Sequence, residues 1–134
     1  MILVDSSVWI DFFNGKATRA TAFLKAQLGR EMFAIGDLML TETLQGFSRD
    51  KDYRKALRLL GEFPVVVIGG RNVAVKAAEH YRKLRKKGIT VRGAIDALIG
   101  AYCIEHSLPL LYSDRDFDAM ARHLGLQPAL EMVH

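Results

Sequence analysis

Four acidic residues occupy positions that a purely structural role explains poorly: Asp5, Glu42, Asp96 and Asp114. Asp5 and Asp114 each follow a short apolar run that is typical of a buried strand. Asp96 is the only charged residue in segment 93–104, which otherwise has the apolar spacing of a buried helix. Glu42 lies in a predicted helix that begins just after a strand. A buried carboxylate normally needs a partner or a metal ion.

These four carboxylates converge if the strands before Asp5 and Asp114 are neighbours. The carboxyl ends of both strands would then share one edge of the sheet, with Glu42 and Asp96 on flanking helices. Carboxylates gathered there would repel and raise one another's pKa unless a cation neutralised them. Oxygen ligands favour Mg²⁺ or Mn²⁺. Zinc is disfavoured because Cys103, the single cysteine, and the four histidines show no ligand spacing.

Simpler explanations stay open for the same acids. Asp5 precedes a predicted helix, so its carboxylate could act only as a helix cap. Asp114, Asp116 and Asp118 surround the start of the last predicted helix, where an acid favours the helix dipole. Three caps are more than one helix needs. Asp96 could lie on a narrow exposed strip of its helix.

The elements that must position these acids follow from the apolar pattern. Short β-favouring runs predict strands at 2–4, 32–35, 65–68 and 108–112, and the tail 126–134 could add a short edge strand. Amphipathic spacing predicts intervening helices, among them 38–47, 72–87, 93–106 and 113–125. This alternation predicts an α/β fold, a three-layer doubly wound parallel sheet of four to five strands flanked by helices. No linker or repeat divides the chain, so we expect a single domain over residues 1–134.

The charge of the chain favours an anionic partner. The net charge is +4, and the basic residues of segment 71–92 are opposed only by Glu79. An ordinary solvated helix face explains most of these basic residues equally well. No apolar run approaches the ~20 residues that span a bilayer, and the first residues lack the basic region of a secretory signal. We therefore expect a cytoplasmic protein that makes no membrane contact.

Four segments together resemble the acidic motifs of PIN domains, most closely those of VapC-type toxins from bacterial type II toxin–antitoxin systems. The segments are Val4-Asp5-Ser6-Ser7-Val8, the helix 38–47 with Glu42, Gly93-Ala94-Ile95-Asp96-Ala97-Leu98-Ile99-Gly100-Ala101 and Ser113-Asp114-Arg115-Asp116-Phe117. The resemblance implies a Mg²⁺- or Mn²⁺-dependent ribonuclease with a central parallel sheet and an acidic pocket. It also implies homodimers and neutralisation by a VapB-type antitoxin, through which alone the protein would meet DNA.

Carried onto this sequence, the resemblance makes Asp5, Glu42, Asp96 and Asp114 the metal-binding and catalytic quartet. Asp116 matches an additional acid that would act from behind these ligands. Tyr112 is a departure, since many relatives have a small hydroxyl residue there, and Ser113 replaces it only if the register allows.

The expected mechanism uses one or two metal ions to activate a water for in-line attack on an RNA phosphodiester. Ser6 or Ser7 could position water or phosphate, although both also suit helix capping. Arg115 and the basic groups of segment 71–92 could hold the RNA backbone.

Two other functions fit parts of the pattern. A phosphatase with an aspartate nucleophile would need an acid two residues after Asp5, where this chain has Ser7. A non-catalytic RNA-binding or protein-interaction module could keep the same fold, and it would bind RNA without metal-dependent cleavage. Asp96→Asn separates this module from a nuclease.

Overall fold

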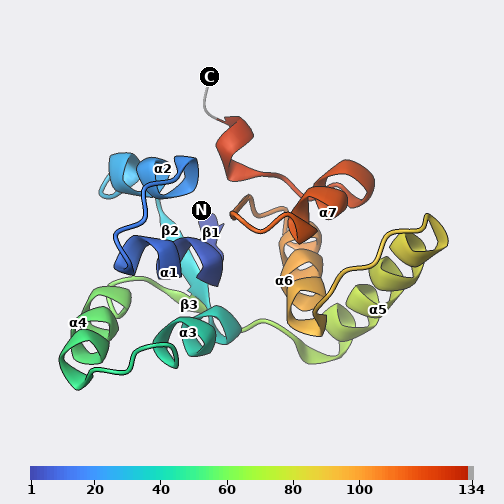
Figure 1. Ribbon diagram of the computed structural model, residues 1–134. Helices are drawn as coiled ribbons and strands as arrows, with labels where there is room; N and C mark the ends of the chain where they lie inside the picture. Colours follow the sequence, from blue (N-terminus) through green and yellow to red (C-terminus); the bar gives the residue numbers. More distant parts are fainter. Residues whose placement is uncertain (133–134) are drawn as a thin grey trace.

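A parallel sheet of four strands forms the centre of the computed structural model, which describes residues 1–132 (Figure 1). The strands are β1 (Ile2–Val4), β2 (Phe33–Gly36), β3 (Val65–Val66) and β4 (Leu110–Leu111), in the spatial order β3-β2-β1-β4. In the central strand, Leu3 pairs with Ala34 of β2 and with Leu110 of β4. All three residues of β1 are buried, as their unbroken apolar run predicts.

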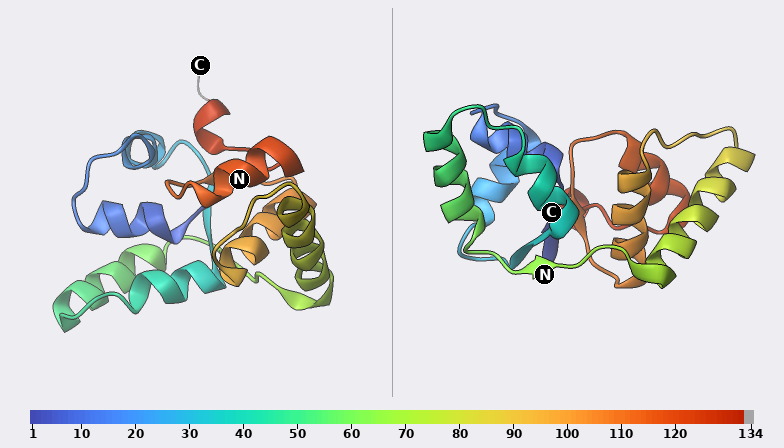
Figure 2. Two further views of the ribbon diagram at one scale, coloured as in Figure 1. Left: turned by 45° about the vertical axis from the view of Figure 1, so that its right-hand side comes forward. Right: turned by 90° about the horizontal axis from the view of Figure 1, so that it is seen from below.

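Helices cover both faces of this sheet. Those between β1 and β3 are α1 (Ser6–Phe13), α2 (Arg19–Gln27), α3 (Asp37–Leu44) and α4 (Asp50–Leu60). After β3 come α5 (Gly70–Lys86), α6 (Ala94–Glu105), α7 (Asp116–Leu124) and a 3₁₀ turn at Ala129–Met132. Figures 1 and 2 show the first set on one side of the strands and α5–α7 on the other. The predicted three-layer doubly wound fold is therefore confirmed.

The order of the strands explains this division. The chain moves outward from β1 to β2 to β3 and then crosses back to β4 on the far side of β1. Right-handed crossovers in opposite directions place their helices on opposite faces. The helices therefore separate between β1 and β4, and in open sheets of this kind a crevice forms there, beyond the carboxyl ends of the strands.

The outer strands are shorter than the sequence predicts. Val67, expected in the third strand, is 75% exposed and lies beyond Val66, where β3 ends. Residues 126–132 do not form the edge strand that was expected in the tail. Leu110 forms one isolated bridge with Pro128, in which the Leu110 N–H donates to the carbonyl of Gln127, and the 3₁₀ turn follows. Pro128 has no N–H to extend the pairing, and residues 133–134 lie outside the described part of the chain.

The start of α3 also differs from expectation. The helix predicted to begin at residue 38 begins instead at Asp37. Its Oδ1 accepts hydrogen bonds from the N–H groups of Leu38 at 2.9 Å and Ile68 at 3.0 Å. Asp37 thus ties the helix that carries Glu42 to the segment after β3.

The aromatic residues of α1 belong to the core. Trp9 is fully buried, and its ring lies 5.9 Å from that of Phe12 and 5.3 Å from that of Phe63, measured between centroids. Cys103 is buried as well, and burial raises its thiol pKa to about 12, which suppresses the reactive thiolate. Within residues 1–132, no helix is both long and apolar enough to cross a membrane.

Candidate functional site

Asp5 stands at the carboxyl end of β1, where the two sets of helices separate. Its N–H donates to the carbonyl of Leu111 at 2.9 Å, so β4 fixes its position. Its Oδ2 accepts from the Ser7 N–H at 3.1 Å and from the Ser7 hydroxyl at 2.6 Å, which caps α1. Its Oδ1 is buried and has no hydrogen-bond partner among residues 1–132. The carboxylate therefore caps a helix with one oxygen and keeps the other available.

The surroundings of Asp5 disfavour a lone negative charge. Burial raises the pKa of its carboxyl above the ordinary value, although the hydrogen bonds from Ser7 oppose this, and the charge of Glu42 raises the pKa further. A buried anion with one unpartnered oxygen is costly unless a cation or a proton compensates it.

Glu42 reaches the same place from α3, which packs against α1. It is half-buried, and its Oε1 accepts a hydrogen bond from the Ser6 hydroxyl at 3.2 Å. The first two residues of α1 thus hold one acid each, Ser6 holding Glu42 and Ser7 holding Asp5. Ser7 also accepts from the backbone N–H of Ser113 at 3.4 Å, which joins this pair to the segment after β4.

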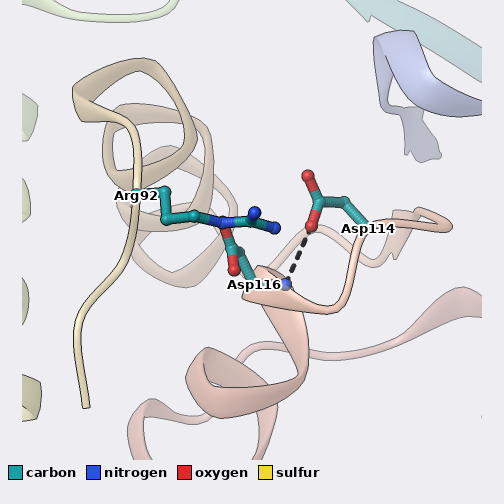
Figure 3. A network of polar contacts seen from close by, with 3 residues as sticks. All are labelled: Arg92, Asp114 and Asp116. Atoms are coloured by element: carbon teal, nitrogen blue, oxygen red, sulfur yellow. Dashed lines mark hydrogen bonds and ion pairs between the residues drawn. The ribbon is translucent and has the colours of Figure 1, made fainter.

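Asp96, Asp114 and Asp116 form a tight acidic group on the other side of the switch point. They come from the first turn of α6, the loop after β4 and the first residue of α7. One carboxylate oxygen from each lies within 4.8 Å of the others. The backbone N–H of Asp116 donates to Oδ1 of Asp114 at 3.0 Å (Figure 3). We call these three residues the acidic group.

The electrostatics of Asp96 connect the acidic group to Asp5 and Glu42. Its pKa is raised to about 7, first by burial and then by the charges of Asp5, Asp114, Glu42 and Asp116. Asp96 is half-buried, so it does not lie on the exposed strip that was the alternative. The structure therefore brings the predicted quartet into one region, but Asp5 and Glu42 lie outside the 4.8 Å group, which Asp116 completes.

The donor set fits a hard divalent cation. Carboxylate oxygens are the ligands that Mg²⁺ and Mn²⁺ prefer, whereas zinc sites draw on Cys and His. The unpartnered Oδ1 of Asp5 is a further buried acceptor, and the charge of Asp5 raises the pKa of Asp96 in the acidic group. Within residues 1–132, a single ion pair supplies positive charge to the acidic group, from Arg92.

Arg92 lies in the loop before α6. Its Nε donates to Oδ2 of Asp116 at 3.3 Å (Figure 3). The Arg92 side chain is 80% exposed, whereas that of Asp116 is 15% exposed. Sequence reasoning placed Arg92 in a basic segment but missed this pairing. Its position four residues before Asp96 was the available signal, because the loop that ends at Gly93 leads directly into α6.

Within residues 1–132, the other predicted residues make no side-chain hydrogen bond or ion pair with the acidic group, or they contribute through the backbone. Arg115 is exposed and forms no ion pair within the described chain. Asp118 accepts a hydrogen bond from the Tyr112 hydroxyl at 2.9 Å, and burial together with this bond raises the pKa of Tyr112. Ser113 acts through its N–H. A cavity of about 490 Å³ begins beside Tyr112 and Ser113 and has none of the quartet in its lining.

Comparisons with known proteins agree with this geometry. The model of the PIN domain matches residues 2–123. Ribonuclease VapC11 of Mycobacterium tuberculosis is 32% identical over 131 residues, which cover 96% of this chain and 98% of that protein. VapBC2 from Rickettsia felis, solved bound to a promoter DNA fragment, matches with a TM-score of 0.74 at 16% identity, over 96% of this chain and 97% of that one. A toxin–antitoxin complex from Klebsiella pneumoniae matches with a TM-score of 0.68 at 20% identity, over 94% and 95% of the two chains. The resemblance seen in the sequence is confirmed, and the chain belongs to the PIN domain family, on its VapC branch.

Proposed function

We propose that the protein is a metal-dependent ribonuclease toxin that hydrolyses RNA phosphodiester bonds and is neutralised by a VapB-type antitoxin. The observation that carries this proposal is the gathering of five acids at the topological switch point: Asp5, Glu42, Asp96, Asp114 and Asp116. Its relative in Mycobacterium tuberculosis is described as a ribonuclease.

The acidic group and Asp5 are the residues that would hold Mg²⁺ or Mn²⁺, with Glu42 beside them. A divalent ion there supplies charge stabilisation to the phosphodiester and acidifies a water ligand. The carboxyl of Asp96, with its pKa of about 7, carries a proton for part of the time near neutral pH. That proton must leave when a cation binds, so cation affinity is expected to rise with pH.

Neighbouring residues would keep these ligands in place. Ser7 fixes Oδ2 of Asp5 and thereby orients the carboxylate whose Oδ1 is available. Ser6 orients Glu42 in the same way, and the backbone N–H of Asp116 orients Asp114. Such supporting hydrogen bonds are typical of metal sites, where they fix ligand geometry.

The partners follow from the same relationship. Two of the solved structures that resemble this chain are complexes of toxin with antitoxin or of VapBC with promoter DNA. We therefore infer a cognate VapB-type antitoxin, a homodimeric toxin, and contact with DNA only through the antitoxin. A cytoplasmic location suits an RNA substrate.

The deciding experiment compares wild-type protein with Asp96→Asn on structured and single-stranded RNA. Wild type is expected to cleave with Mg²⁺ or Mn²⁺ and to stop when EDTA is added. Asp96→Asn removes one of the proposed ligand charges, and we expect a loss of at least about 100-fold in cleavage rate.

Asp118→Asn is the matched control, because Asp118 lies on α7 close in sequence to the acidic group but outside it. Cleavage that survives both EDTA and Asp96→Asn would contradict the proposal. RNA binding without any metal-dependent cleavage would favour a non-catalytic module instead.

A further inference from the structure

We propose that Arg92 is a substrate-binding residue that holds the RNA phosphate next to the acidic group, and that Asp116 positions it. This inference rests on the proposed function, since it assigns a phosphate contact for that reaction. The carrying observation is one contact, in which Nε of Arg92 donates to Oδ2 of Asp116 at 3.3 Å.

The contact uses only a small part of the guanidinium. Arginine has five N–H donors, and Arg92 donates only its Nε–H to Asp116. No other hydrogen bond of its side chain is present within residues 1–132, and the side chain is 80% exposed. The two terminal NH₂ groups are therefore free to bind an anion. Guanidinium groups bind phosphate through two parallel hydrogen bonds, so a free pair of this kind suits a phosphodiester.

Asp116 is anchored on its other side. Its carboxylate is 15% exposed, and its backbone N–H holds Oδ1 of Asp114. Figure 3 shows the Arg92 side chain reaching the carboxylate of Asp116, whose backbone N–H holds Asp114. Asp116 thus links a proposed metal ligand to Arg92, and a phosphate held by Arg92 lies beside the acidic group.

Arg92 also borders a groove whose lining contains none of the five acids. This groove has a volume of about 570 Å³ and lies between α5 and α6. Arg82 and Arg85 line it together with Arg92. Three guanidinium groups along one groove suit the successive phosphates of a strand that continues from the acids toward α5.

An ordinary surface ion pair is the competing explanation. Exposed pairs of this kind contribute little to stability, so Arg92→Gln is expected to fold normally and the comparison is clean. The matched control is Arg30→Gln. Arg30 is exposed and precedes β2. Its substitution therefore removes the same charge at the opposite, amino-terminal edge of the sheet.

The test measures kcat and KM for a short RNA, and Mn²⁺ affinity by calorimetry, for wild type, Arg92→Gln, Arg92→Lys and Arg30→Gln. We expect kcat/KM of Arg92→Gln to fall by about 10- to 100-fold, as for loss of a charged hydrogen bond. Mn²⁺ affinity is expected to stay within about two-fold of wild type. Arg92→Lys should recover part of the loss, because it keeps the charge but not the forked donors.

Asp116→Asn tests the positioning role, and it is assayed at saturating Mn²⁺ because Asp116 also belongs to the acidic group. If Asp116 acts through Arg92, this change lowers kcat/KM much less in the Arg92→Gln background than in wild type. Equal losses in both backgrounds would show that Asp116 does not position Arg92. If Arg92→Gln and Arg30→Gln have the same kcat/KM, Arg92 does not contact the phosphate. The proposal is also wrong if weaker Mn²⁺ binding by Arg92→Gln accounts for its whole loss of kcat/KM.

RNA affinity in the Asp96→Asn background distinguishes failure of this inference from failure of the proposed function. If wild type cleaves no RNA, the proposed function is wrong. Affinity for RNA falls as salt rises. Adding Arg92→Gln to Asp96→Asn is still expected to make the slope of log affinity against log salt less steep, by about the amount that one phosphate contact contributes. An unchanged slope would mean that Arg92 holds no phosphate.

Discussion

Asp96 shows how a single carboxyl can report on the charge of the whole site. Its pKa rises to about 7 because burial and the neighbouring acids both disfavour its ionised form. In the unfolded chain the same carboxyl titrates near its ordinary value of 3.8. Between these two values the folded state binds more protons than the unfolded state. The free energy of unfolding contributed by Asp96 is therefore largest at low pH and decreases as pH rises from about 4 to about 7.

Urea denaturation in EDTA across this pH range tests that sign. Asp96→Asn cannot ionise, so we expect its stability relative to wild type to increase steadily from about pH 4 to about pH 7 and then to level off. Titrating groups that do not interact with Asp96 cancel in this difference. A difference that stays constant with pH, or that falls, would mean that Asp96 is not held near neutral by its neighbours.

At the scale of elements, the apolar pattern predicted most of the fold. The runs at β1 and β2 are buried on both faces, and the helical spacing in 72–87 and 93–106 corresponds to α5 and α6. The outer strands were predicted too long because propensity describes side chains, whereas pairing ends when the neighbouring backbone leaves the sheet. Tertiary contacts decided those boundaries.

The candidate site was predictable only as a set of positions. Asp5 and Asp114 could be placed because both follow apolar strands, and Asp96 because it interrupts an apolar helix. The Arg92–Asp116 pair was missed, because the position of Arg92 four residues before Asp96 does not identify Asp116 as its partner. The sequence also could not show that Oδ2 of Asp5 caps α1 while Oδ1 has no hydrogen-bond partner within residues 1–132.

The close packing at the junction of β2 and α3, the helix that carries Glu42, predicts how a substitution there changes stability. A Cβ at Gly36 would collide with Sδ of Met39 and would lie 2.8 Å from Cγ1 of Ile68, and both side chains are buried. Gly36→Ala is therefore expected to lower the free energy of unfolding by about 1–3 kcal/mol. At Gly46, beyond the end of α3, a Cβ meets only a carbonyl at 3.6 Å, so Gly46→Ala should cost much less. Equal losses in urea denaturation would show that crowding at this junction is not decisive.

For the whole molecule, the doubly wound topology gathers acids that lie far apart in the sequence. Asp5 and Glu42 come from the half that contains α1–α4, whereas Asp96 and Asp116 come from α6 and α7 on the other side. The two halves meet at β1 and β4, which pair directly. A cation held by acids from both halves would therefore join the two layers of helices, and its binding would stabilise the fold as a unit.

Thermal unfolding with and without Mn²⁺ tests this coupling. A ligand at 100 times its Kd that binds only the folded state adds about 2.7 kcal/mol, which raises Tm by roughly 10 °C for a chain of this size. Asp114→Asn removes one member of the acidic group, so we expect most of that gain to disappear. Asp118→Asn, which changes an acid outside the group, should keep the gain because its carboxylate only accepts from Tyr112. The same increase in wild type and both variants would mean that Mn²⁺ binds elsewhere on the protein, and the acids at the switch point would then not form its site.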